Sequence, residues 1–181
     1  MHLTPSIGLQ NAVGLRGDLT VLRRDAATGA LLFAWEKKNV ITFGAGTALV
    51  TLLAPNLAFG VNAQLENQIK SMRFGTSNLA PQRSDTDLAA EAVVSGDPVR
   101  IELFDANRIV GSAGTVEFTA ILDAATGNGV TYREACLFTR GTLDDPLLTS
   151  GATAFSRQVY PDQIKTAVVE LEYRWRISIS V

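Results

Sequence analysis

The sequence contains almost no histidine or cysteine. Its single histidine is His2 and its single cysteine is Cys136, in a chain of 181 residues. One cysteine excludes an internal disulfide framework and a cysteine-rich zinc site. The lone histidine lies beside the N-terminus, where chains most often fray. We therefore expect neither histidine-based catalysis nor a histidine-ligated metal. The composition therefore favours a protein that is not an enzyme and that carries no cofactor.

The sequence also lacks an excess of charge of one sign and any long hydrophobic run. The formal net charge is −2, and basic residues do not alternate with aromatic ones, so we expect no nucleic-acid partner. The longest apolar stretches, near residues 30–35 and 45–54, are shorter than the roughly 20 residues that span a bilayer. The N-terminus shows no signal-peptide pattern. We therefore expect no membrane partner and synthesis in a reducing cytoplasm, which suits a free cysteine.

What is present is strand-forming sequence. Hydrophobic residues make up 46% and charged residues 19% of the chain, enough for a sizeable core. The clearest pattern is at the C-terminus, where residues 169–181 alternate between apolar and polar side chains and so predict a long, half-buried antiparallel strand. The apolar face comprises Val169, Leu171, Tyr173, Trp175, Ile177, Ile179 and Val181. Shorter strands are predicted at residues 69–74, 99–103, 116–122 and 132–138.

These strands and one predicted helix indicate a mainly β fold. Residues 42–54 carry leucines at helical spacing, with Thr42 placed to cap the start and Pro55 to end the helix. The fold class is therefore an antiparallel β-sandwich, jelly-roll-like or barrel-like, with one short helix. Sandwich and barrel both remain open at this point.

The N-terminal part predicts an arm followed by a β-hairpin. Residues 1–17 have no clear period and are interpreted as an extended arm. Residues 19–24 and 30–35 favour strands, and the turn formers between them, ending in Gly29, predict the connecting loop. We accordingly divide the chain into an N-terminal arm and hairpin, residues 1–37, and a β-sandwich domain, residues 38–181.

Carboxylates are the remaining candidates for chemistry. Asp85 and Asp87, with Glu91 downstream, are candidate ligands for a hard cation such as calcium. The favoured alternative is a cap at Ser84 or Asp85 on a short helical turn, because acids stabilise a helix N-terminus. Glu170, Glu172, Arg174 and Arg176 lie on one face of the last strand. They suggest a ladder of opposite charges more readily than a glycosidase-like acid pair.

Two further motifs have simple structural explanations. Cys136 lies in the apolar run 135–138 and is expected to be a small buried hydrophobe, not a nucleophile activated by the neighbouring Arg133 and Glu134. Residues 43–47, Phe-Gly-Ala-Gly-Thr, resemble a phosphate-binding turn but lack its lysine and its third glycine. We therefore expect the glycines to allow close packing.

Taken together, several of these segments resemble virion structural proteins of tailed bacteriophages. The similarity is carried by residues 38–44 before the helix, 69–76, and 81–91 with its Ser-Asp-Thr-Asp-Leu. It continues through 116–122, 127–138, 152–157, 164–165 and the closing strand. The resemblance is to small β-rich proteins of the tail, baseplate or fibre-attachment region, and also to proteins that decorate capsids or collars. It implies an assembly role in the virion, with no catalytic residues to carry over.

This resemblance leads to the expected function. We expect a non-enzymatic virion protein that forms a homo-oligomer and attaches to other tail, neck, fibre or capsid proteins. The N-terminal arm and hairpin should contact neighbouring subunits, because exposed strand edges and arms are common means of assembly. The predicted interface residues are Leu19, Val21, Leu31, Phe33 and Trp35. The alternatives are a capsid decoration (cement) protein and a carbohydrate- or receptor-binding β module, for which Trp35 would be the exposed aromatic residue.

Overall fold

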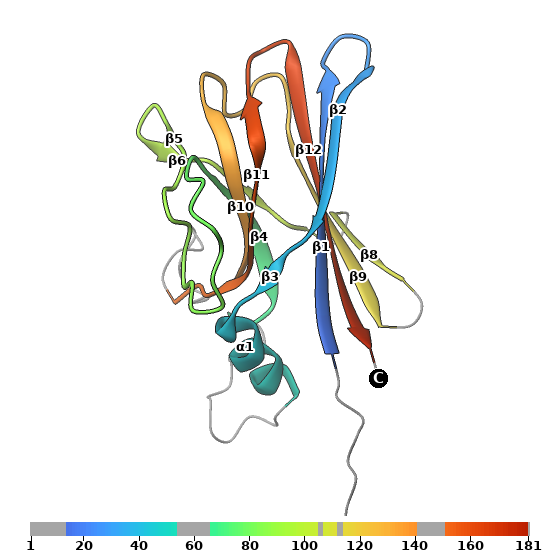
Figure 1. Ribbon diagram of the computed structural model, residues 1–181, viewed down its shortest axis with the longest axis vertical. Coiled ribbons are helices and arrows are strands. Elements are labelled where there is room, and N and C mark those ends of the chain that lie inside the picture. The colour runs from blue at the N-terminus through green and yellow to red at the C-terminus, as the bar shows by residue number, and fades with distance from the viewer. Residues whose placement is uncertain (1–13, 54–65, 105–106, 112–113, 141–150, 181) are drawn as a thin grey trace, which may run out of the picture.

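Two five-stranded antiparallel sheets, packed face to face, make up the fold (Figure 1). The computed structural model describes residues 14–53, 66–104, 107–111, 114–140 and 151–180. Each sheet keeps two separate edge strands, so the sheets do not close on themselves. The predicted antiparallel β-sandwich with one short helix is therefore confirmed, and the barrel-like alternative is wrong.

The first sheet includes the N-terminal hairpin and the C-terminal strand. In spatial order its strands are β2 (Leu31–Lys38), β1 (Gly14–Asp25), β12 (Val169–Ser180), β9 (Thr115–Leu122) and β8 (Arg108–Val110). Because β1 lies between β2 and β12, the hairpin and the segment from residue 38 onward build one continuous sheet. Residues 14–17 of the predicted arm belong to β1 and pair with β12, while residues 1–13 lie outside the described residues.

The second sheet is formed by the middle of the chain. In spatial order its strands are β3 (Val40–Ile41), β11 (Ala154–Ile164), β10 (Thr131–Thr139), β4 (Ile69–Gly75) and β7 (Arg100–Glu102). A small separate hairpin joins β5 (Val93–Val94) to β6 (Asp97–Pro98). The four shorter strands predicted from the sequence all occur, with no end shifted by more than one residue.

The core lies between the sheets, and β12 contributes most to it. Leu171, Tyr173, Trp175 and Ile177 are buried, while the side chains that alternate with them face outward, as the period-two pattern predicts. Val169 at the start of the strand is half-buried, and Ile179 near its end is exposed. Val181 lies outside the described residues.

Helix α1 (Phe43–Leu53) lies at one end of the sandwich, close to the predicted residues 42–54 (Figure 1). The hydroxyl of Thr42, expected to cap this helix, instead donates to the carbonyl oxygens of Ala154 and Phe155. Gly44 lies against β11, because a Cβ built there would overlap the Thr153 side chain and lie 2.6 Å from the Ala154 carbonyl oxygen. A Cβ on Gly46 would meet open space, so only the first of the two glycines allows a close approach.

A third layer covers part of the outer face of the second sheet. The segment of residues 76–92 follows β4 and contains no helix, so the predicted helical turn beginning near Ser84 or Asp85 is wrong. We call it the covering segment. Beneath it, Cys136, Phe138 and Ala154 form a small apolar cluster against which Leu88 packs. Cys136 is thus a buried hydrophobe, as predicted, and burial raises the pKa of its thiol well above the ordinary value.

Candidate functional site

The β1–β2 hairpin holds the five residues predicted to form an assembly interface. Leu19 and Val21, on β1, are fully buried in the core, so they contact the second sheet and present nothing to another molecule. Phe33 and Trp35, on β2, are partly buried on the same side of the sheet. Only Leu31 is largely exposed, at 54%. The three interface residues that reach the surface all lie on β2, and Leu31 is the most exposed of them.

The partly buried aromatic residues of β2 cover the second sheet. The ring of Trp35 lies 6.1 Å from that of Tyr160 on β11, measured between centroids. The guanidinium of Arg23 lies 5.9 Å from the centroid of the Phe33 ring. Leu32, which the sequence did not single out, is 50% exposed, and close to it the pairing of β1 with β2 shifts register between Arg23 and Arg24. Such a bulge cannot be located from hydrophobic alternation alone.

The loop that closes the hairpin is ordered by one aspartate. Asp25 Oδ1 accepts hydrogen bonds from the N–H groups of Ala27 and Thr28, at 3.1 and 2.8 Å, and from the Thr28 hydroxyl at 2.8 Å. The Thr28 hydroxyl and these N–H groups lower the pKa of Asp25. Gly29 follows with a φ of 70°, a conformation that glycine adopts without strain. This turn sets the position at which β2 begins.

The backbone of β2 has one side without a strand in the described part of the chain. The Asn39 N–H donates to the Gly17 carbonyl at 3.0 Å, which makes the odd-numbered residues of β2 the ones that bond to β1. By the same alternation, the N–H and C=O groups of Ala34 and Glu36 point away from β1. On the other side of β1, the Ala26 N–H donates to the Val168 carbonyl, so the even-numbered residues of β1 are the ones that bond to β12. The edge of β2 can therefore accept another strand.

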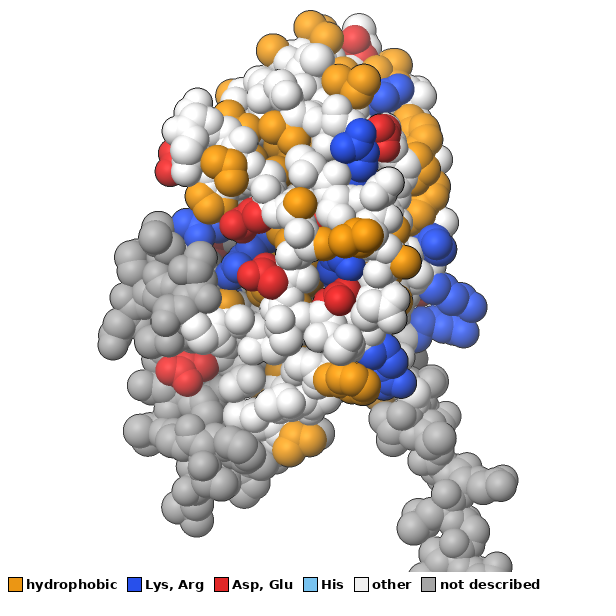
Figure 2. Space-filling model, turned by 60° about the vertical axis from the view of Figure 1, so that its left-hand side comes forward, with side chains coloured by type: hydrophobic (Ala, Val, Ile, Leu, Met, Phe, Trp, Pro, Cys, Tyr) orange, Lys and Arg blue, Asp and Glu red, His pale blue; other side chains and the backbone are white. Residues whose placement is uncertain are grey.

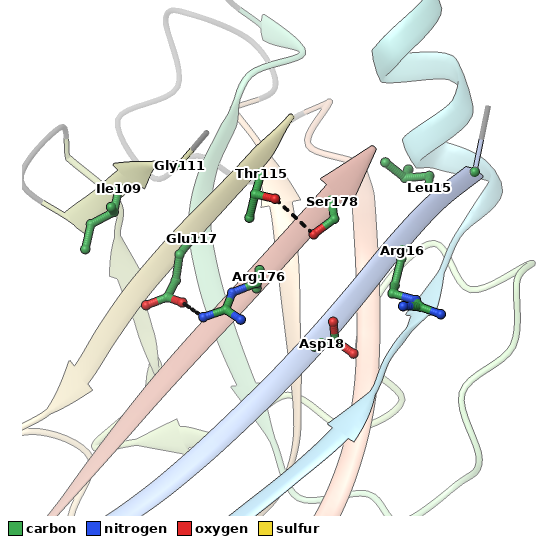
Figure 3. A pocket seen from close by; sticks show the side chains of 10 residues that line it. Leu15, Arg16, Asp18, Ile109, Gly111, Thr115, Glu117, Arg176 and Ser178 are labelled. Carbon is green, nitrogen blue, oxygen red and sulfur yellow. Dashed lines mark hydrogen bonds and ion pairs between the residues drawn. The ribbon is translucent and has the colours of Figure 1, made fainter. Parts of the chain in front are cut away.

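The outer face of the first sheet carries a charged groove of about 980 Å³ (Figure 3). Arg16 and Asp18 of β1 lie on one side of it, and Glu117 of β9 lies on the other. Arg176 of β12 lies between them, and its Nη2 is 3.0 Å from Glu117 Oε2. The hydroxyls of Thr115 and Ser178 lie 3.3 Å apart across the same strands. The groove is thus walled mainly by polar and paired charged side chains.

The charges predicted on β12 form a ladder with their neighbours. Glu172 lies between two arginines, 3.1 Å from Arg24 Nε and 2.6 Å from Arg174 Nη2. Arg176 pairs with Glu117 rather than with an acid of its own strand. Each carboxylate oxygen of Glu172 thus contacts an arginine, which is an arrangement of paired opposite charges and not of two facing acids. The ladder of opposite charges predicted for this face is therefore present.

A buried ionic cluster, which sequence reasoning missed, joins the second sheet to the covering segment. Glu134 of β10 is fully buried, and its carboxylate accepts a 2.7 Å hydrogen bond from Arg157 Nε on β11. It also accepts the N–H groups of Ala89 and Ala90, at 3.1 and 2.8 Å. The only sequence signal is a glutamate within an otherwise buried strand. Its neighbour Arg133 pairs instead with the exposed Asp162 and donates to the Thr76 carbonyl.

The two aspartates proposed as metal ligands have other partners. Asp85 Oδ2 lies 2.8 Å from Arg157 Nη1 and also accepts the Gln82 N–H at 2.8 Å. Asp87 Oδ1 accepts the N–H of Leu88 at 2.8 Å. Within the described residues, no group of three or more His, Cys, Asp or Glu side chains is placed to hold a metal ion. Asp85 thus serves to anchor the covering segment.

Charges of both signs are also mixed on the side of the molecule drawn in Figure 2, where acidic and basic side chains lie close together over the middle of the face. Comparisons of the chain with family models, with curated proteins and with solved structures found no match. Within the described ranges, no helix has both the length and the apolar composition needed to span a bilayer.

Proposed function

We propose that this chain is a non-enzymatic structural subunit of a tailed-bacteriophage virion and that it associates with a second copy through the edge of β2. The observation that carries the proposal is this edge. It is eight residues long, it has Leu31 and Leu32 exposed, and no strand of the described chain pairs with its outer side. Exposed edges of this kind are templates for strand pairing with another chain.

The sequence of β2 suits antiparallel pairing with itself. If a two-fold axis passes through Ala34, Phe33 lies opposite Trp35 of the second copy, and Glu36 lies opposite Leu32. The outward-facing backbone groups of Ala34 and Glu36 then meet their counterparts, and no like charges are placed opposite each other. A register centred on Glu36 would set two carboxylates face to face, which is unfavourable. The pairing would join two five-stranded sheets into one.

The placement in a virion rests on the sequence resemblance, and the charge distribution supports an assembly role. A net charge of −2 suits dense packing, where like charges would repel. Tail, baseplate or fibre-attachment proteins are the preferred context, with capsid decoration as the alternative. In either case the other virion proteins would be its partners. The predicted contacts of residues 1–13 lie outside the described residues.

The carbohydrate-binding alternative depends on an exposed aromatic platform. Trp35 is partly buried and packs near Tyr160, so it offers less of its face to a sugar ring than the alternative requires. We therefore retain the assembly role as the proposed function.

The test is the mass of the purified chain in solution. Size-exclusion chromatography with light scattering over a range of concentrations should show a dimer that dissociates on dilution. Leu31→Lys, at the edge of β2, would set its charge opposite Lys37 of the second copy in this register, so it should shift the equilibrium towards monomer. Ile109→Lys is the matched control, because Ile109 is also exposed, at 62%, but belongs to β8 at the opposite edge of the first sheet.

Each other result has a defined meaning. A monomer at every concentration would overturn self-association through β2. A larger ring that Ile109→Lys disrupts as strongly as Leu31→Lys would overturn the two-fold arrangement. It would indicate head-to-tail contacts between β2 and β8, as expected for a heterologous interface.

A further inference from the structure

We propose that a pocket between β1, the end of β2 and the covering segment binds a phosphate or sulfate group. The pocket has a volume of about 420 Å³, and its basic side chains are Arg16, Lys38 and Arg83. Among the described residues, no aspartate or glutamate lines it. We call it the cationic pocket. The inference goes beyond the proposed function, and neither depends on the other.

The three cations of this pocket lack the acidic partners that several other surface arginines have. Arg24 and Arg174 pair with Glu172, Arg176 pairs with Glu117, and Arg133 pairs with Asp162. By contrast, Arg16, Lys38 and Arg83 take part in no ion pair within the described residues. Asp18 stands opposite Lys38 in the register, but it lines the adjoining groove and not this pocket. Three basic residues without an ion pair in the described part of the chain therefore line one pocket.

Lys38 is held in position through its backbone. Its carbonyl accepts a 3.0 Å hydrogen bond from Nε2 of the buried Gln158. The next residue, Asn39, donates its N–H to the Gly17 carbonyl and its side-chain amide to the Ser156 hydroxyl. Only glycine fits at position 17, because an added Cβ would overlap the Asn39 amide. The floor of the pocket is thus fixed by contacts from two strands.

Arg83 is held from the opposite side. Its carbonyl accepts the N–H of Phe43 at 2.7 Å, at the start of α1. The neighbouring Gln82 and Asp85 close a turn through two hydrogen bonds, of 2.8 and 3.2 Å, and Asp85 is bound in turn to the buried Arg157. The Arg83 guanidinium lies 5.2 Å from the centroid of the Phe43 ring. These contacts place its charge at the rim of the cationic pocket.

This arrangement fits a tetrahedral oxyanion. Arginine offers several N–H donors in a planar fork that matches phosphate and sulfate oxygens, and lysine adds a point charge. Donors arriving from three separate segments can reach different oxygens of the same group. The pocket is larger than a single phosphate requires, so there is room for the group that carries it, such as a sugar. Both a free ion and an ester share the chemistry that the pocket would recognise.

The experiment is a titration of the isotope-labelled full chain with inorganic phosphate, followed by ¹H–¹⁵N NMR at constant ionic strength. Saturable shifts are expected at the amides of Lys38, Asn39 and Arg83. Lys38→Gln and Arg83→Gln should each weaken binding by about two- to fivefold, the range for exposed ion pairs. Arg174→Gln is the matched control, an exposed arginine outside the pocket, and should bind phosphate as the wild type does.

A second titration, with glucose 6-phosphate, distinguishes the two sources of the anion. Tighter binding than inorganic phosphate would support an ester as the ligand, and equal binding would support the ion alone. Shifts that do not saturate, or that change equally in Lys38→Gln, Arg83→Gln and Arg174→Gln, would overturn the proposal, because they would indicate general charge screening. All three substitutions are at exposed positions, so loss of folding does not obscure the result.

Discussion

The carboxylate of Glu134 lies 2.6 Å from Nη2 of Arg157, and both side chains are buried under the covering segment. The pair does not stand alone. Arg157 also reaches Asp85 and the Leu79 carbonyl, while Glu134 accepts N–H groups from residues 89 and 90. The two side chains thereby neutralise each other, and they also form hydrogen bonds with the backbone of the covering segment, which has no regular secondary structure. They hold this third layer on the sandwich.

Replacing Arg157 should show how much the fold depends on this pair. Arg157→Met leaves the Glu134 carboxylate buried without its counter-charge, so the free energy of unfolding should fall by about 3–5 kcal/mol. Urea denaturation followed by circular dichroism measures the loss. Amide hydrogen exchange at Ala90, whose N–H donates to Glu134, should become faster in the same variant.

Arg133→Met is the matched control for this prediction. Arg133 also binds a carboxylate through two bonds, Nε to Asp162 Oδ1 at 2.9 Å and Nη2 to Oδ2 at 2.8 Å, but at the surface. Its replacement should leave the denaturation midpoint close to that of the wild type, because water takes over the exposed carboxylate. Equal losses in the two variants would show that burial is not what makes the Arg157 pair important.

The two glycines of α1 should respond in opposite directions to the same substitution. Gly46→Ala adds a methyl group in open space and improves helix propensity, so it should stabilise the protein by about 0.5–1 kcal/mol. Gly44→Ala pushes a methyl group against β11, so it should lower the free energy of unfolding of the protein by about 1–3 kcal/mol. Thermal denaturation of both variants checks the prediction. A stabilised Gly44→Ala would mean that α1 does not pack against β11 as closely as described.

All three tyrosines of the chain are buried, which predicts how it behaves at alkaline pH. Burial raises the pKa of Tyr132 to about 12 and raises the pKa values of Tyr160 and Tyr173 as well. Above pH 10, the ordinary value, the unfolded state loses these protons while the folded state keeps them. Stability should therefore fall with rising pH, by about 1.4 kcal/mol per pH unit for each tyrosine that titrates only when unfolded.

The measurement is a pH titration that records tyrosinate absorbance and circular dichroism together. The two transitions should coincide, because tyrosinate forms only as the chain unfolds. Tyrosinate that appears near pH 10, while the strand signal is still intact, would contradict the burial of at least one ring. Tyr173→Phe keeps the ring but removes one titrating group, so its stability should fall less steeply with pH.

The sandwich was predictable where local patterns and tertiary structure agree. The alternation from Val169 to Ile177 predicts both the strand and its buried face, and the turn between Asp25 and Gly29 predicts the hairpin. In each case the signal lies within a dozen residues. The same holds for Cys136, whose apolar neighbours already indicate that it is buried.

The rest depends on contacts between distant segments. The covering segment follows no period, and its path is set by Glu134 and Arg157, so the sequence suggested a helical cap at Asp85 where an ion pair exists. The sequence prediction places Leu19 and Val21 at an interface because exposed strand edges and arms are common means of assembly. Here β12 pairs with β1 and turns both side chains into the core. The convergence of Lys38 and Arg83 has no signal in the linear sequence.

The most direct test of the central claim, pairing through the edge of β2, is the dimerisation constant of Ala34→Pro by sedimentation equilibrium. The Ala34 N–H faces away from β1, so proline removes a hydrogen-bond donor from the free edge without breaking the hairpin. The account predicts that dimerisation weakens about tenfold or more, since each copy loses a bond at the two-fold axis, while circular dichroism is unchanged. A variant that folds and dimerises as tightly as the wild type would contradict it.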